Sequence, residues 1–493
     1  MPDLHQVGQL RRGVLGLSDA FAQSLALLAL ALGSSLATTG VAADAGAAVP
    51  LTYVIAGVGS LCLGSVIIRF SKRMASAGGV YTYIARGLGP NSGFIGGWLY
   101  GIGFAAGISF VLVISAVYLS QVLEAHAHIQ IGWFAAFFIL MAILSVISFL
   151  DVRISTRAQL VASAIGAVAI IVAMVIILAK GGQNGINAQP FNPSHAHGLH
   201  NIFLGTVLAF TGFIGFESAA ALGEEVAEPL RRVPQAILSV VIVGLLFYVF
   251  VTWTMSLGFG VDNAAAWAKD PTALDTLTTR YAGSGLAVIV DLAVVIDAFV
   301  AALAGVHLTS RTLFAMSRDG GLPRVFAWTH PRFRTPWAGI VLALVVTLVL
   351  VIWLARSTYD PFTYFAFMAT TASLGILATY ILISLGGMRF FWREQRAGGA
   401  RFNVVLDVVL PVAAVAICGL TIYYSIEPVP PHPIDLAPWV ALSWLVIGLI
   451  VLAFIHLRAP ERIPQFGMAL GEGEASDPDL EPPADGIPIK HAI

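Results

Sequence analysis

Charged side chains are scarce in this sequence. Asp, Glu, Lys and Arg make up 11% of its 493 residues, whereas soluble domains carry about 25%. So few charges cannot cover the surface of a water-soluble fold, and 58% of the residues are hydrophobic. The formal net charge of −1 also gives no basic surface for a nucleic acid. The composition therefore predicts a membrane protein with a lipid bilayer around it and no nucleic-acid partner.

Cysteine is almost absent as well. Cys62 and Cys418 lie far apart inside apolar segments, so no disulfide framework or thiolate metal site is expected. The predicted spans contain no Ser/His pair and no HExxH motif, which argues against an intramembrane enzyme. The histidines of residues 195–200 have no acid or cysteine beside them to complete a metal site. We therefore predict no enzymatic activity, no cofactor and no metal site.

Apolar segments of about 20 residues, the length that crosses a bilayer, recur along the chain. With the N-terminus placed inside, Arg and Lys concentrate in the cytoplasmic loops, as the positive-inside rule requires. We predict an all-α polytopic protein of the plasma membrane, the bacterial inner membrane, with both termini cytoplasmic. The twelve predicted transmembrane helices lie approximately at residues 15–40, 50–69, 93–122, 131–150, 158–179, 201–222, 236–259, 284–309, 337–355, 361–387, 404–425 and 439–457.

Two of these spans are interrupted. The sixth reads FTGFIGFE at residues 210–217, with two glycines and an acid at membrane depth. The first reads ALALGSSLATTG, with small residues at 33–35. Backbone that leaves the helix inside a bilayer is tolerated only where it lines a protein cavity. Discontinuous helices at corresponding places in two halves are typical of a transporter's binding site.

Three blocks of the sequence resemble amino acid–polyamine–organocation (APC) permeases. They read SAGGVYTYIARGLGPNSGFIGGW (76–98), FIGFESAAALGEEVAEPLRRVPQAI (213–237) and RTLFAMSRDGGLPRVFAWTHPRFRTPWAG (311–339), in the expected order. The resemblance extends from about residue 13 to residue 458. It implies a LeuT-type fold, a 5+5 inverted repeat in which helices 1 and 6 are discontinuous and the last two spans are peripheral. This agrees with the two interruptions found five spans apart.

The same resemblance divides the chain into regions. The last region turns polar, acidic and Pro-rich and cannot bury a core, so we expect it to be disordered. The predicted regions are a cytoplasmic N-terminal tail (1–14), a first repeat (15–180), a second repeat (201–388), two further spans (402–458) and a disordered cytoplasmic C-terminal tail (459–493).

The two interruptions supply the candidate substrate-binding residues. N–H groups at the start of a half-helix suit a carboxylate, and freed carbonyl groups suit an ammonium. The resemblance implies the same assignment and adds an aromatic gate from the sixth span. The alternative is that the small residues only allow close helix packing. The candidates are Gly33, Ser34 and Ser35 for the carboxylate, and Phe210, Thr211, Gly212, Phe213 and Ile214 on the ammonium side, with Phe216 placed among the gating residues.

Glu217 and Asp297 are candidate gating or coupling acids, because an ionised acid at the bilayer centre costs at least about 2.5 kcal/mol. Glu217 has the alternative role of an acid stabilised by a helix N-terminus. For Asp297 a proton carrier, an anchor for a cationic substrate group and a buried structural hydrogen bond all remain open. Many sodium-independent relatives carry a lysine in the fifth span, where this chain has Gly166. That usual substitute for a sodium ion is therefore missing here. The intramembrane acids make proton coupling our first choice, with exchange or sodium coupling as alternatives.

Two further expectations concern partners and the cytoplasmic side. Acids at 224–228 and arginines at 231, 232, 311 and 318 form either a solvated face or an inner gate of ion pairs. Residues 120–132 contain no cysteine, so no disulfide-linked accessory subunit is expected. We predict a secondary active transporter that takes up a small-molecule substrate, an amino acid or related amine, by alternating access with H⁺ as the coupling ion.

Overall fold

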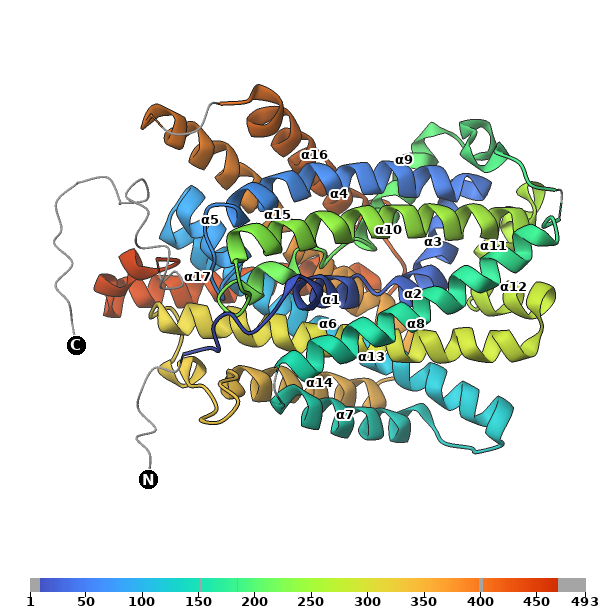
Figure 1. Ribbon diagram of the computed structural model, residues 1–493, viewed down its shortest axis with the longest axis horizontal. Helices are drawn as coiled ribbons and strands as arrows, with labels where there is room; N and C mark the ends of the chain where they lie inside the picture. Colours follow the sequence, from blue (N-terminus) through green and yellow to red (C-terminus); the bar gives the residue numbers. More distant parts are fainter. Residues whose placement is uncertain (1–8, 151, 184, 399–401, 469–493) are drawn as a thin grey trace.

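The computed structural model describes residues 9–150, 152–183, 185–398 and 402–468. The regular elements of these residues are all helices, and one isolated β-bridge joins Leu15 to Val226. Most of the long helices run along the longest axis of the molecule (Figure 1). The prediction of an all-α polytopic protein is confirmed at this level.

Within the described residues, nine segments are long and apolar enough to cross a membrane. Two shorter apolar helices, α7 (Trp133–Phe149) and α9 (Leu199–Thr211), accompany them. The nine are Leu17–Ser71, α6 (Pro90–Ala127), α8 (Val152–Ala179), α10 (Pro229–Phe259), α13 (Ser284–Arg318), α14 (Trp337–Arg356), α15 (Pro361–Arg396), Val405–Tyr424 with α16 (Leu410–Tyr424), and Ile434–Arg458 with α17 (Ala437–Arg458).

The first of these segments contains several helices. It consists of α1 (Leu17–Leu28), α2 (Leu30–Leu32), a π-helical turn at Gly33–Ala37, α3 (Thr38–Ala45), a 3-10 turn at Gly46–Ala48 and α4 (Val49–Ser71). α1 packs against α8, α10 and α13, and α4 packs against α9 and α10. Helices α1 and α4 therefore lie inside the bundle.

Large apolar side chains are exposed on the outside of the bundle. Val161, Ile165 and Val168 of α8 are each more than half exposed, as are Ile450 and Phe454 of α17. Exposed apolar faces of this extent suit contact with lipid, because lipid tails are as apolar as the side chains. The chain is therefore a multi-pass membrane protein.

The two ends of the bundle differ. Both ends of the described chain lie at the left of Figure 1, together with α5 (Val80–Leu88), and we call this the terminal end. The opposite, or loop, end carries α3, α11 (Ala264–Ala268) and α12 (Ala273–Ala282).

The chain after α17 folds back on the terminal end. Residues Pro460–Gln465 form a 3-10 helix, and Phe466 is completely buried. The N–H of Gly467 donates to the Tyr81 hydroxyl (2.8 Å) and to Asp319 Oδ2 (2.7 Å). The prediction of disorder from residue 459 is therefore wrong for residues 460–467, because Phe466 supplies an apolar anchor among polar neighbours. The rest of the predicted tail, 469–493, and residues 1–8 lie outside the described residues.

Candidate functional site: a cavity between two broken helices

The helix α9 ends at Thr211, inside the bundle. The chain then continues in turns through Gly212–Glu217 and resumes as a 3-10 helix at Ser218–Leu222. Gly215 adopts φ +102°, and a Cβ there would lie 2.7 Å from the Leu27 side chain. Only glycine fits this backbone and this close approach. The break predicted from the sequence is present at this place.

The first break lies at Ala29, which adopts the left-handed φ of +50° between α1 and α2. Our prediction placed it four residues later, at Gly33–Ser35, where the structure has a π-helical turn instead. That position was wrong because Ala29 has no local signal for a break. A left-handed alanine costs about 1–2 kcal/mol, and contacts from distant helices hold it.

Asp297, on α13, makes one of these contacts. Its Oδ2 accepts the backbone N–H of Ala31 (2.8 Å) and of Leu32 (3.1 Å), and the side chain is 1% exposed. The first N–H groups of a helix have no partner within it, so the carboxylate satisfies two groups freed by the break. Of the roles left open for Asp297, the structure shows the buried hydrogen bond.

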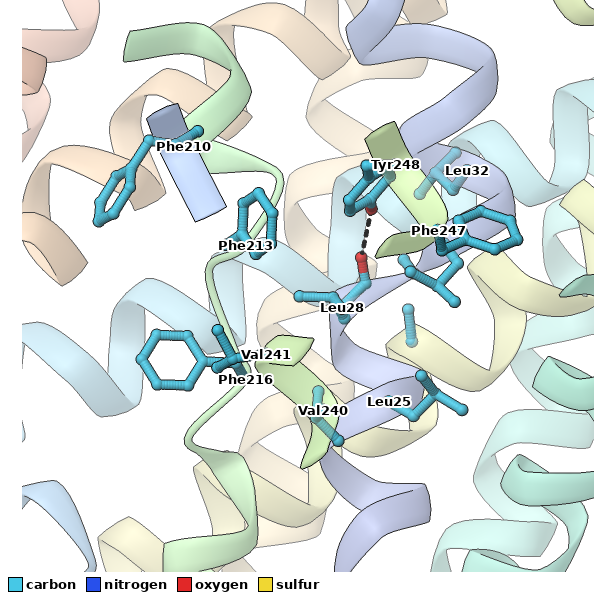
Figure 2. Close-up of a cluster of buried hydrophobic side chains, with 14 of the residues drawn as sticks. Leu25, Leu28, Leu32, Phe210, Phe213, Phe216, Val240, Val241, Phe247 and Tyr248 are labelled. Carbon is cyan, nitrogen blue, oxygen red and sulfur yellow. Dashed lines mark hydrogen bonds between the residues drawn. The ribbon is translucent and has the colours of Figure 1, made fainter. Parts of the chain in front are cut away.

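Tyr248, on α10, makes the second contact. Its hydroxyl donates to the carbonyl of Leu28 (3.0 Å) and lies 3.4 Å from the carbonyl oxygen of Gly212 (Figure 2). A Cβ on Gly33 would lie 2.4 Å from the same hydroxyl. Tyr248 therefore contacts both breaks, and its hydroxyl leaves no room for a side chain at residue 33. Sequence reasoning missed it, because a tyrosine inside an apolar helix has no distinguishing pattern.

A cavity of about 470 Å³ opens between the two breaks. Four predicted binding residues line it: Gly33, Thr211, Gly212 and Ile214. Asp44, near the end of α3, also lines the cavity and was missed, because our predicted first span ended at residue 40. The other lining elements are α1, α2, α6, α9, α10, α13, α15 and residues 424–434.

The remaining predicted residues lie away from the cavity lining. Ser35 is hydrogen-bonded to the Tyr118 hydroxyl (2.7 Å), and the hydroxyl of Ser34 is buried without a hydrogen-bond partner. The structure does not bring these two serines to the cavity. Their side chains therefore serve helix packing in this conformation.

The three phenylalanines follow one another along the broken segment (Figure 2). All are buried, and none is among the cavity-lining residues. Phe213 packs edge-on against Tyr248 (centroids 5.5 Å apart), and Phe216 packs near Tyr380 (6.3 Å). Phe210 faces Gly59 of α4. Their role as a gate remains a prediction.

Glu217 lies at the end of the broken segment and is completely buried. The Tyr100 hydroxyl donates to its Oε1 (2.6 Å), whereas Oε2 has no hydrogen-bond partner. Tyr380 also lies beside the carboxyl group, and its hydroxyl accepts the N–H of Gly215 (3.3 Å). A buried carboxyl group with an oxygen left unpaired is costly unless it is protonated or gains a partner.

Two ion pairs join the broken segment to α13 at the terminal end. Arg311 donates to Glu225 through Nε and Nη2 (2.5 and 3.1 Å), and each side chain is at most 2% exposed. Arg318 donates to Glu224 through Nη1 and Nη2 (2.9 and 2.7 Å). The predicted alternative of a solvated face is therefore wrong for Glu225 and Arg311. The two ion pairs thus hold residues 224–225 against α13 at the terminal end.

Helices that face lipid and break around a central cavity define the chain as a membrane transporter. The family model for amino acid permeases matches residues 15–452, and the chain belongs to this family. This family consists of permeases, not enzymes.

Three similar proteins have assigned substrates. The low-affinity putrescine importer PlaP of Escherichia coli K12 is 25% identical over 428 residues, 85% of this chain and 88% of that protein. The methylthioribose transporter of Bacillus subtilis is 25% identical over 433 residues (85% and 87%). The branched-chain amino acid permease BcaP of B. subtilis is 25% identical over 450 residues (86% and 89%).

Proposed function

We propose that this protein is a secondary active transporter that moves amino acids or related amines across the plasma membrane by alternating access, with proton-coupled uptake. The observation that carries the proposal is the cavity of about 470 Å³ where two broken helices meet. This volume suits a small ligand. The three relatives are named for putrescine, methylthioribose and branched-chain amino acids, which are all small molecules.

The proposed topology has twelve spans in a LeuT-type arrangement. Leu17–Ser71 would cross twice, as α1–α3 and then α4, and the shorter α7 and α9 would each cross once. With the other eight segments these make twelve. The repeats would be residues 15–180 and 201–388, and α1 and α9 would each begin a repeat. The distribution of arginine supports an inner-membrane protein whose terminal end is cytoplasmic.

In this orientation the structure would be closed toward the cytoplasm by the ion pairs of Arg311 and Arg318. Uptake would require these pairs to separate while the other side closes. We propose Thr211, Gly212, Ile214 and Gly33 as the predicted residues that contact substrate, because they line the cavity. Phe216 remains our gate residue, since it adjoins Glu217 on the segment that must move.

We assign the coupling proton to Glu217. One of its oxygens is unpaired and the residue is buried, so binding a proton would remove a charge that burial penalises. Asp297 is the weaker candidate because two backbone N–H groups already stabilise its charge. Exchange and sodium coupling are the alternatives.

Uptake by the purified full chain in proteoliposomes tests this assignment. A panel of amino acids and amines is offered under separately imposed proton and sodium gradients, and with substrate preloaded inside. We expect saturable uptake that an inward proton gradient stimulates, and Glu217→Gln should lose that stimulation while still inserting and folding. The matched control is Glu228→Gln, which changes an exposed carboxylate nearby. Stimulation by sodium alone, by preloaded substrate alone, or unaltered proton stimulation in Glu217→Gln would contradict the assignment.

A further inference from the structure

Most of the N–H groups at the two breaks already have partners within the protein. Those of Ala31 and Leu32 donate to Asp297, and that of Gly33 donates to the carbonyl of Ala29 (2.8 Å). In the second break the N–H groups of residues 212–214 donate to backbone carbonyls three residues back (3.0–3.1 Å), and that of Gly215 donates to Tyr380. Each N–H has a single hydrogen. These groups therefore have none left for the carboxylate of a ligand.

Hydrogen-bond acceptors, by contrast, remain at the cavity wall. The carbonyls of Leu28 and Gly212 belong to lining residues and meet only the Tyr248 hydroxyl. A carbonyl oxygen has two lone pairs, so each keeps one for a ligand. The lining hydroxyls of Thr211, Thr370 and Ser425 donate to backbone carbonyls of their own segments (2.7, 2.8 and 2.7 Å). Toward the cavity they therefore act as acceptors.

The charge of the cavity points the same way. Among the lining residues that the structure describes, Asp44 is the one acid, and no Lys, Arg or His lines the cavity. Asp44 is partly exposed at the loop end, away from the ion pairs of Arg311 and Arg318. A wall with a carboxylate and surplus acceptors attracts a cationic donor and repels an anion.

We propose that Asp297 is a specificity-determining residue, which occupies with its own carboxylate the N–H groups that would otherwise bind the carboxylate of an amino acid. The cavity then accepts organic cations without a carboxylate, namely aliphatic amines and diamines. Asp44 pairs with one ammonium, and the free lone pairs of the Leu28 and Gly212 carbonyls receive another. This inference rests on the proposed transport function and narrows its substrate class.

Matched substrate pairs test the inference. Each pair differs only in a carboxylate: ornithine and putrescine, lysine and cadaverine, leucine and 3-methylbutylamine. The kcat/KM for uptake of each is measured with the full chain in proteoliposomes. Because Asp297 occupies the N–H groups of Ala31 and Leu32 and no cationic side chain is among the described lining residues, we expect the amine to exceed its amino acid by at least about tenfold. An amino acid equal to or better than its amine would overturn the inference and leave the transport function standing. Uptake of neither member of any pair would overturn both.

Variants of Asp297 and Asp44 test which residues cause the preference for amines over amino acids. Asp297→Ala removes the acceptor and frees the N–H groups of Ala31 and Leu32. We expect the amine preference to fall about tenfold, mainly through improved uptake of amino acids. Asp297→Asn keeps an oxygen for the two N–H groups and is the matched control, which should retain the preference. Asp44→Asn should lower uptake of the diamines, whereas Asp262→Asn, an exposed acid of the loop end that does not line the cavity, should not. An unchanged preference in a folded Asp297→Ala protein would overturn the role of Asp297. If that variant fails to fold, the wild-type pair ratios and the Asp44 and Asp262 variants decide.

Discussion

At the scale of single residues, the site depends on a few polar side chains that hold unfavourable backbone in place. Ala29 adopts a left-handed conformation without the freedom of glycine. Asp297 and Tyr248 offset that cost from opposite sides, one by accepting N–H groups and the other by donating to a carbonyl. The break is therefore a property of three helices together, and no substitution within α1 or α2 alone would create it.

The close approach of Tyr248 to residue 33 gives a prediction. In Gly33→Ala the new methyl group would meet the Tyr248 hydroxyl at 2.4 Å and the adjoining ring carbon at 3.1 Å. Overpacking of this kind costs about 1–3 kcal/mol of folding free energy. We expect a lower melting temperature in detergent and reduced uptake.

The double variant Gly33→Ala/Tyr248→Phe isolates this contact. Removing the hydroxyl relieves the closest overlap, so Gly33→Ala should cost less in the Tyr248→Phe background than in the wild type. Gly419→Ala in α16 is the control, since its new methyl group would touch nothing. Additive losses in the double variant would show that the clash is not the cause.

At the scale of elements, the short segment after α17 is held by buried polar contacts. Gly467 donates to Asp319 Oδ2, and so does the Tyr81 hydroxyl (3.0 Å). Burial raises the pKa of Asp319 to about 6, although Arg318 and these donors act to lower it. Asp319 directly follows α13 at the terminal end and lies outside the apolar spans.

This pKa predicts a pH dependence of stability. Between about pH 4 and pH 6 the folded protein binds a proton on Asp319 that the unfolded chain has released. The contribution of Asp319 to the free energy of unfolding is therefore greatest below about pH 4. It falls as the pH rises to about 6 and is constant above that pH. The loss amounts to at most about 3 kcal/mol.

Melting temperatures in detergent across pH 4–7 measure this effect. Asp319→Asn should remove the decrease in melting temperature between about pH 4 and pH 6. Glu228→Gln, which changes an exposed carboxylate, should leave that decrease unchanged. An identical slope in wild type and Asp319→Asn would exclude Asp319 as its source.

At the scale of the whole molecule, the two ends of the bundle differ in their polar contacts. The terminal end has the ion pairs of Arg311 and Arg318, whereas the cavity is lined by Asp44 of α3, a helix of the loop end. Glu225 and Arg311 come from segments far apart in the chain, and the backbone of Leu15 also bonds Glu225 (3.0 Å). The start of the chain, the broken segment and α13 thus meet at one point. A change of conformation that opens the terminal end must separate these contacts.

Breaking the buried pair should therefore affect stability strongly. Arg311→Ala leaves Glu225 buried without its cation, which costs about 3–5 kcal/mol. Arg232→Ala removes a partner from the exposed Glu228 and should cost about 0–1 kcal/mol. Melting curves of the two variants in detergent make the comparison. Similar small losses in both would show that the buried pair does not hold the terminal end closed.

Much of this organisation follows from composition and local pattern. Hydropathy and the scarcity of charge determine an all-α membrane protein, since lipid leaves the backbone few other ways to satisfy its hydrogen bonds. The broken segment at Gly212–Glu217 was predicted because two glycines and an acid interrupt an apolar span. The family was predicted from three blocks in order, which a spanning pattern alone would not distinguish.

The tertiary structure decided what those segments do to one another. It moved the first break to Ala29, because the partners that stabilise this residue come from α10 and α13, more than 200 positions away in the chain. Among the roles left open for Asp297, it showed a hydrogen-bond acceptor for the backbone, and it placed Asp44 and Tyr248 at the cavity. Local sequence determines where a helix is favourable in lipid and where it is weakened. Which acid or hydroxyl then stabilises a break depends on the helices that pack against it.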